Sequence, residues 1–142
     1  TRHLCWRVCL DMKFKYKKYG GGILRPVIPI ELVHNGIEVP YEVLVDSGAD
    51  MCIFDAQIAD ILGIDITQGD RHEVAGVTGV CEPYYVFPLT LRIGDRLYTF
   101  RAGFLSGMGR FGYGVVGQKG FFDNFIVKFD LLKEEIELKL RK

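Results

Sequence analysis

In one stretch of the sequence, a predicted apolar strand is followed directly by a carboxylate and small residues. This combination could form a catalytic or binding site. Residues 41–45 are rich in aromatic and β-branched side chains, so we predict a buried strand there. Asp46 follows this run directly. A carboxylate at the end of a buried strand is unfavourable unless it is paired or hydrogen-bonded. The small residues Ser47, Gly48 and Ala49 leave space for a backbone, a ligand or a second copy of the loop to approach.

The same residues are also compatible with an ordinary turn. Asp and Ser side chains hydrogen-bond their own backbone in turns, and Gly adopts positive φ there. The strand before Asp46 favours a site instead, and so do Asp50 and the apolar run 51–54 that follow. We therefore interpret residues 46–50 as a candidate functional loop.

Residues 44–50, Leu-Val-Asp-Ser-Gly-Ala-Asp, resemble the active-site motif of the retropepsin-type aspartic proteases. That motif is two hydrophobic residues followed by Asp, Thr or Ser, Gly and Ala. The resemblance implies an all-β, small, closed, barrel-like fold with one or two short helices. It also implies hydrolysis of peptide bonds, with no metal or other cofactor.

The resemblance assigns roles within this loop residue by residue. Asp46 would be catalytic, and Ser47, Gly48 and Ala49 would support the active-site loop. Ser47 would bond across a dimer and hold two loops together. Gly48 and Asp50 would bind the backbone of a peptide or protein substrate.

A second signature lies further along the chain. Val115, Val116 and Gly117 match the retropepsin pattern of two hydrophobic residues and Gly, followed by a short helix. The resemblance places this strand beside the catalytic loop. The family often has an Arg after the glycine, and this Arg pairs with the Asp at the position of Asp50. Here Gln118 can donate an amide hydrogen bond but carries no charge.

The chain holds only one Asp-Ser-Gly in a strand-and-loop context. Aspartic protease chemistry requires two carboxylates that share a proton, one acting as base toward a water and one as acid toward the carbonyl. Asp123 and Asp130 are the other candidates, but neither is followed by small residues. We therefore expect a homodimer with its two-fold axis between two Asp46 side chains.

Hairpins are predicted along most of the chain. Asn35-Gly36 is a strong turn signal between strands at 27–33 and 37–45. Pro26 and Pro29 favour an edge position for the first of these strands. Further hairpins are expected at 84–105 and at 125–140. In the last one, strand 135–140 alternates apolar and charged residues, which suits equally an interface strand with one wet face and a strand packed on its own core.

A helix and a flap are predicted between these hairpins. Asp55 suits the N-cap of a helix over 55–62 that ends at Gly63. Residues 71–81 read as a hairpin with a glycine-rich tip. Within the resemblance this hairpin is the flap that closes over the substrate, so Gly76 and Val77 are expected to contact it.

Composition limits the remaining classes of function. The chain has 142 residues, of which 49% are hydrophobic and 25% charged, typical of one folded domain. Eighteen basic residues balance eighteen acidic ones, so no strong field favours nucleic acid or a membrane surface as a partner. The four cysteines show neither a paired zinc spacing nor a dense disulfide framework, which favours reduced thiols and a cytoplasmic location.

Two domain segments and two functions are considered. Residues 1–22 are interpreted as an N-terminal arm and 23–142 as the protease domain. The first function is an aspartic endopeptidase with an Asp46 dyad from two chains. The alternative is a catalytically idle retropepsin-like module for dimerisation or peptide binding, which Gln118 and the glycine-rich loop 106–114 leave open.

Overall fold

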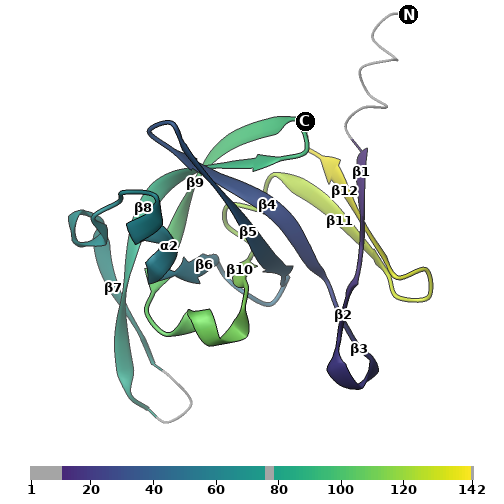
Figure 1. Cartoon of the computed structure of the whole chain (residues 1–142), viewed down its shortest axis with the longest axis horizontal. Helices are drawn as coiled ribbons and strands as arrows, with labels where there is room; N and C mark the ends of the chain where they lie inside the picture. Colours follow the sequence, from purple (N-terminus) through teal and green to yellow (C-terminus); the bar gives the residue numbers. More distant parts are fainter. Residues whose placement is uncertain (1–10, 76–78, 142) are drawn as a thin grey trace, which may run out of the picture.

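The chain is built around a closed β-barrel (Figure 1). The computed structural model describes residues 11–75 and 79–141. Its helical segments are α2 (Ala56–Ile61) and three 3₁₀ turns, η1 (Gly20–Gly22), η2 (Ile66–Gln68) and η3 (Met108–Phe111). Its strands are β1 (Asp11–Lys15), β2 (Lys17–Tyr19), β3 (Ile23–Arg25), β4 (Val27–His34), β5 (Ile37–Val45), β6 (Cys52–Asp55), β7 (Asp70–Ala75), β8 (Cys81–Ile93), β9 (Arg96–Leu105), β10 (Gly114–Val116), β11 (Phe125–Asp130) and β12 (Glu135–Leu140).

Six strands close the barrel in the order β4, β5, β10, β6, β9 and β8, and β7 extends β8 beyond it. Pairing of β4 with β8 at residues 31–33 completes the ring. Most neighbours are antiparallel, but β10 runs parallel to β5 and β6 runs parallel to β9. The predicted closed, barrel-like all-β fold is therefore confirmed.

The hairpin that leads to the candidate loop forms as predicted. Asn35 (φ 48°) and Gly36 (φ 80°) both have positive φ between β4 and β5, which suits the right-handed twist of the strands. The register runs from His34 opposite Ile37 to Val27 opposite Leu44. The turn thus fixes which residue ends β5.

The expectation of an edge position for β4 is corrected by the barrel. This strand pairs with β5 along its whole length and with β8 at Glu31–Val33. Pro29 lies before the part that pairs with β8, where β4 has a neighbour on one side only. A missing N–H is tolerated at such a position. The proline therefore marks where pairing with β8 stops.

The barrel core is dominated by aromatic rings. Phe54 of β6 is fully buried, and its ring makes edge contacts with Tyr41 at 5.4 Å, Phe100 at 5.9 Å and Phe104 at 6.2 Å between centroids. Such pairs add favourable geometry to the area that they bury. The short strand β6 is thus held in the barrel centre, next to the candidate loop.

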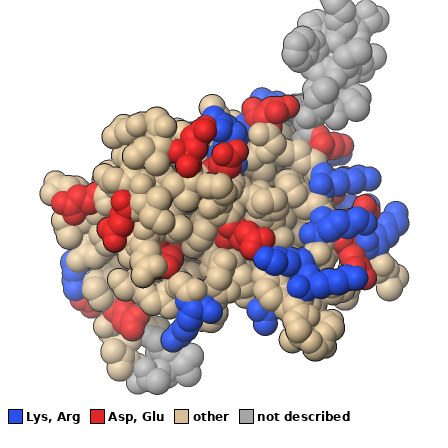
Figure 2. All heavy atoms as spheres, viewed as in Figure 1, with Lys and Arg blue, Asp and Glu red and all other residues tan. Residues whose placement is uncertain are grey.

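A separate three-stranded sheet, in the order β1, β12 and β11, covers one side of the barrel. Ile136 and Leu138 on β12 are fully buried in the core of their own chain. On the other face, Glu137 and Glu135 lie 3.9 and 3.8 Å from Lys13 and Lys15. Figure 2 shows basic side chains gathered on this side of the molecule, with acidic ones among them.

The position of β12 bears out the second of the two alternatives for this strand, packing on its own core. Both of its edges are already paired, one with β1 and one with β11. Its apolar face packs on its own core, so the alternation of its sequence reflects burial within one chain. The free edges of this sheet belong to β1 and β11.

The predicted helix after the first loop is confirmed, and the one after Gly117 is not. Asp55 caps α2, accepting a hydrogen bond from the Gln57 N–H at 3.3 Å. Residues 118–124 instead form wide turns, in which the Phe122 N–H donates to the Gly117 carbonyl at 3.2 Å. Gly120 has φ of 98°, a left-handed backbone that a continuous right-handed helix cannot contain.

A matched pair of leucine substitutions tests the packing of β12 on the core of its own chain. Leu138 is fully buried and Leu132, in the turn before β12, is 97% exposed. Leu138→Ala should lower the free energy of unfolding by about 2–5 kcal/mol because it leaves a cavity. Leu132→Ala should change it by about 0.5 kcal/mol or less. Urea denaturation of both variants measures the difference, and equal losses would contradict the burial of β12 in its own chain.

Candidate active site

Asp46 lies at the end of β5 in a loop that returns to β6. Its backbone N–H donates to the Val116 carbonyl of β10 at 3.0 Å, and its carbonyl accepts from the Ala49 N–H at 3.2 Å. The Gly48 N–H donates to Asp46 Oδ1 at 2.9 Å. The side chain is half-buried. One carboxylate oxygen is thus held by the loop, and Asp46 Oδ2 has no hydrogen bond within the described parts of the chain.

The loop favours a glycine after Ser47. A Cβ atom at Gly48 would lie 3.2 Å from Asp46 Oδ1, closer than an ordinary contact. The small residue lets the backbone N–H approach the carboxylate. This hydrogen bond holds one oxygen of the Asp46 carboxylate; the supporting role of Gly48 stays a prediction.

The strand β10 and the residues after it hold the other side of the loop. The Gln118 N–H donates to the Ala49 carbonyl at 2.8 Å, and the Lys119 N–H donates to the Asp50 carbonyl at 3.0 Å. A Cβ atom at Gly117 would lie only 2.5 Å from the Ala49 oxygen and 2.6 Å from the Met51 oxygen. The second sequence signature therefore lies against the first, as predicted.

The Gln118 side chain braces the loop through its backbone. Its Nε2 donates to the Ser47 carbonyl at 3.0 Å. Asp50 is exposed, and its carboxylate forms no ion pair within residues 11–75 and 79–141. The amide thus stabilises the loop at Ser47, and the carboxylate of Asp50 stays available to solvent or a ligand.

Cys52, directly after the loop, has a structural role. It is fully buried, and its Sγ donates to the Lys119 carbonyl at 3.4 Å. Burial raises the pKa of this thiol to about 12. The thiol therefore stays protonated near neutral pH and is not a nucleophile.

The base of the predicted flap faces the loop across an apolar cavity of about 260 Å³. The flap is the hairpin of β7 and β8, as the sequence indicated. Gly76 and Val77 lie outside the described residues. The cavity is lined from the loop, β6, the flap and β9 by Ala49, Asp50, Met51, Ile53, Val74, Tyr84 and Leu105.

Sequence reasoning missed five of these lining residues, namely Met51, Ile53, Val74, Tyr84 and Leu105. The only sequence signal was an apolar residue in each strand, which is equally typical of a core position. Gly103 gave a further hint, because a Cβ atom there would lie 2.8 Å from Ile53 Cδ1. Glycine inside a strand often marks such a close approach.

The β2–β3 hairpin is tied to the loop that precedes β10. Arg25 Nη1 donates to the Tyr113 hydroxyl at 3.1 Å, and the guanidinium lies 4.9 Å from the centre of the Tyr19 ring. The next residue, Pro26, accepts a hydrogen bond from the Val45 N–H at 2.9 Å. This hairpin therefore lies close to the end of β5 and flanks the site.

The other aspartates considered from sequence serve turns. Asp123 Oδ1 accepts from the Gly120 N–H at 3.0 Å, and Asp130 Oδ1 accepts from the Lys133 N–H at 3.1 Å. Among the described residues, no group of three or more His, Cys, Asp or Glu side chains could hold a metal ion. In the same residues, no helix is long and apolar enough to span a bilayer.

Comparisons with known proteins agree with this geometry. A model of a family described as aspartyl protease matches residues 29–119. The chain is similar to the crystal structure of a retropepsin-like aspartic protease from Rickettsia conorii, with a TM-score of 0.64 and 15% identity over 92% of each chain. It is also similar to EIAV protease complexed with the inhibitor HBY-793, with a TM-score of 0.50 and 20% identity over 72% of this chain and 88% of that one. A search of curated proteins found no match.

The contact at Gly117 gives a test of the loop geometry. Gly117→Ala should lower the free energy of unfolding by about 2 kcal/mol or more, because the new methyl group meets backbone oxygens that cannot move independently. Gly20→Ala is the control, since no atom lies within 4 Å of its Cβ position. Urea denaturation measures both, and a harmless Gly117→Ala would show that the loop is not packed on β10.

Proposed function

This chain belongs to the aspartyl protease family and has the retropepsin fold, and from that premise we propose that it is an aspartic endopeptidase whose catalytic pair is Asp46 from two copies of the chain. The observation that carries the proposal is the Asp46 loop. One carboxylate oxygen is held by the Gly48 N–H, and the half-buried side chain ends a strand of the barrel. Neither Asp123 nor Asp130 can serve as its partner, since both cap turns.

The chemistry follows from two carboxylates that share one proton. The ionised Asp46 takes a proton from a water molecule, whose oxygen attacks the carbonyl carbon of the substrate peptide bond. The protonated Asp46 donates its proton to the carbonyl oxygen, giving a tetrahedral diol. Return of a proton to the amide nitrogen then breaks the carbon–nitrogen bond and releases an acid and an amine. Each carboxylate acts once as acid and once as base.

The described residues around Asp46 suit an extended peptide. The apolar cavity of about 260 Å³ beside Ala49 and Asp50 can take one aliphatic or aromatic side chain of the substrate. Asp50 has its carboxylate exposed next to this cavity. Val74 and Tyr84 bring the flap to the opposite wall. Substrate would thus lie between the loop and the flap.

The second copy of the chain is proposed to dock beside the Asp46 loop and the small sheet. The free edges of that sheet are β1 and β11. On β11, Ile126 and Phe129 are 48% and 40% exposed, so two large apolar side chains face solvent there. A two-fold axis would bring two such surfaces and two Asp46 loops together.

The idle binding module is disfavoured by the role of Gln118. Its missing charge was the main argument for an incomplete site. In the fold its amide supports the Ser47 carbonyl, so the loop is braced without an ion pair. A loop kept in this geometry supports an active enzyme more than a scaffold that has lost its chemistry.

Replacement of the catalytic carboxylate tests the reaction. Asp46→Asn should lower kcat for cleavage of peptides by at least about 100-fold, because the amide can neither take nor give the proton. The Asn Oδ1 can still accept from the Gly48 N–H, so the thermal unfolding midpoint should change little. Cleavage of a mixed peptide library, followed by mass spectrometry, measures the effect. Wild-type rates in the variant would remove Asp46 from the mechanism.

Mixing of chains tests whether the pair comes from two copies. Wild-type protein is incubated with roughly a tenfold excess of Asp46→Asn, so that most wild-type chains enter mixed dimers with a single Asp46. Specific activity per wild-type chain should fall about tenfold, and sedimentation should show a dimer throughout. The control is an equal excess of an unrelated protein. Undiminished activity in the mixture would mean that one chain carries a complete site.

A further inference from the structure

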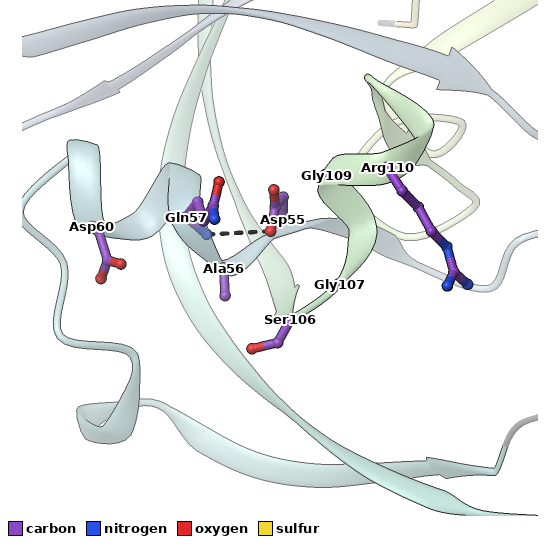
Figure 3. Close-up of a pocket in the computed structure, with 8 residues that line it drawn as sticks. All are labelled: Asp55, Ala56, Gln57, Asp60, Ser106, Gly107, Gly109 and Arg110. Atoms are coloured by element: carbon purple, nitrogen blue, oxygen red, sulfur yellow. Dashed lines mark hydrogen bonds between the residues drawn. The ribbon is translucent and has the colours of Figure 1, made fainter.

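A second cavity, of about 530 Å³, lies beside the apolar one and has no part in the proposed chemistry. It opens between the start of α2, the end of β9 and η3 (Figure 3). We propose that it binds the basic side chain, lysine or arginine, of a peptide whose neighbouring residue occupies the apolar cavity. The orientation of this peptide rests on the proposed function. The lining residues are Asp55, Ala56, Gln57, Asp60, Ser106, Gly107, Gly109 and Arg110.

The central observation is the buried carboxylate of Asp55. It is 7% exposed, and it is the one charged or polar side chain among the buried residues of the described segments. Its Oδ2 has no hydrogen bond or ion pair within those segments and lies against η3, where a Cβ atom at Gly109 would be 2.8 Å away. Tyr98 has the only buried side-chain oxygen or nitrogen of these segments that lacks a partner, so Asp55 Oδ2 keeps some exposure to the cavity. The cavity therefore offers an unpaired acceptor to a positively charged donor.

The capping of α2 accounts for only one of the two oxygens of the Asp55 carboxylate. The cap uses Oδ1, which accepts from the Gln57 N–H. Asn and Ser cap helices about as well as Asp, so the cap does not require a charge. The backbone N–H of Asp55 is also satisfied, since it donates to the Tyr41 hydroxyl at 3.2 Å. The negative charge and Oδ2 remain unexplained by the fold.

Arg110, the basic residue that lines the cavity, does not form an ion pair with Asp55. Arg110 packs on the neighbouring Phe111, with its guanidinium carbon 5.0 Å from the ring centre. In Figure 3 its side chain runs away from Asp55, and no ion pair joins the two. The cavity lining thus holds two acidic residues, Asp55 and Asp60, and one basic residue, Arg110.

The other lining groups favour a nitrogen cation over a metal ion. Within the described segments, no cluster of three or more carboxylate, imidazole or thiol ligands is present. The Gln57 amide oxygen and the Ser106 hydroxyl can accept N–H donors beside the two carboxylates. The volume suits a long side chain, and a lysine or arginine can reach Asp55 with its charged end while its stem lies over Ala56.

The two cavities are adjacent on one face of the barrel. Ile53 lines the apolar cavity and Asp55 the polar one, and both point to the same side of β6 because they are two residues apart. On the parallel neighbour β9, Leu105 pairs with Asp55 and lines the apolar cavity, while Ser106 lines the polar one. Ile53 and Asp55, one from each cavity, are thus about 7 Å apart along β6.

An extended peptide has the same spacing. Its side chains on one face are two residues and about 7 Å apart. In the proposed orientation the peptide runs alongside β6, so that an apolar residue in the first cavity presents the side chain two positions away to the second. The inferred preference is a lysine or arginine at that position of the substrate.

The first arm of the test uses cleavage. Two peptides are made from the library sequence that is cleaved best. At the position two residues from the apolar one, the first carries lysine and the second norleucine, so that they differ only in the ammonium group. For wild type, kcat/KM should be about tenfold higher for lysine. Asp55→Asn keeps the cap but removes the charge and should bring the ratio close to one. Asp65→Asn is the matched control, because Asp65 caps η2 outside the cavity, and it should leave the ratio unchanged.

The second arm uses binding and does not need catalysis. Labelled Asp46→Asn protein, with and without Asp55→Asn, is applied to an array of ten-residue peptides. The Asp46→Asn protein should prefer a basic residue two positions from an apolar one, and the double variant should lose this preference. Selective binding of basic peptides without cleavage would support this inference and contradict the proposed peptidase activity. Absence of basic selectivity in the array, or a lysine preference that survives Asp55→Asn, overturns the inference even if peptides are cleaved.

Discussion

The site depends on a backbone contact that only glycine permits. Gly117 lies so close to the carbonyls of Ala49 and Met51 that a methyl group would overlap them. This approach lets the N–H groups that follow Gly117 bond the loop, while Asp46 is bonded to the end of β10. The carboxylate is therefore placed by three strands at once, because β10 pairs with both β5 and β6. Its position is a property of the barrel rather than of a flexible turn.

The barrel also places two chemically different cavities next to each other. The parallel pair of β6 and β9 ends with Asp55 opposite Leu105, and of these two residues Asp55 lines the polar cavity and Leu105 the apolar one. A rigid sheet fixes the distance between them. Recognition of a peptide by its side-chain spacing would then follow from strand geometry, with no need for a mobile element.

Folding of one chain and the proposed assembly of two use different parts of the small sheet. Ile136 and Leu138 complete the core of their own chain, and the ion pairs of β12 with β1 lie on the outer face. One chain thus has a closed barrel and a covered core before any partner arrives. The proposed dimer adds only the second carboxylate and the contacts around it. Assembly would therefore control activity more than stability.

Local chemistry in the sequence determined the Asp46 loop, the Asn35-Gly36 hairpin and the Asp55 cap, because turns and caps depend on neighbouring residues. The resemblance of two short motifs supplied the fold. Only the tertiary structure decided that Gln118 bonds Ser47, that β4 is paired on both sides and that residues 118–124 turn at Gly120. The two cavities were equally out of reach, since their walls come from strands far apart in the chain. Such contacts form when the barrel closes, and no window of the sequence contains both partners.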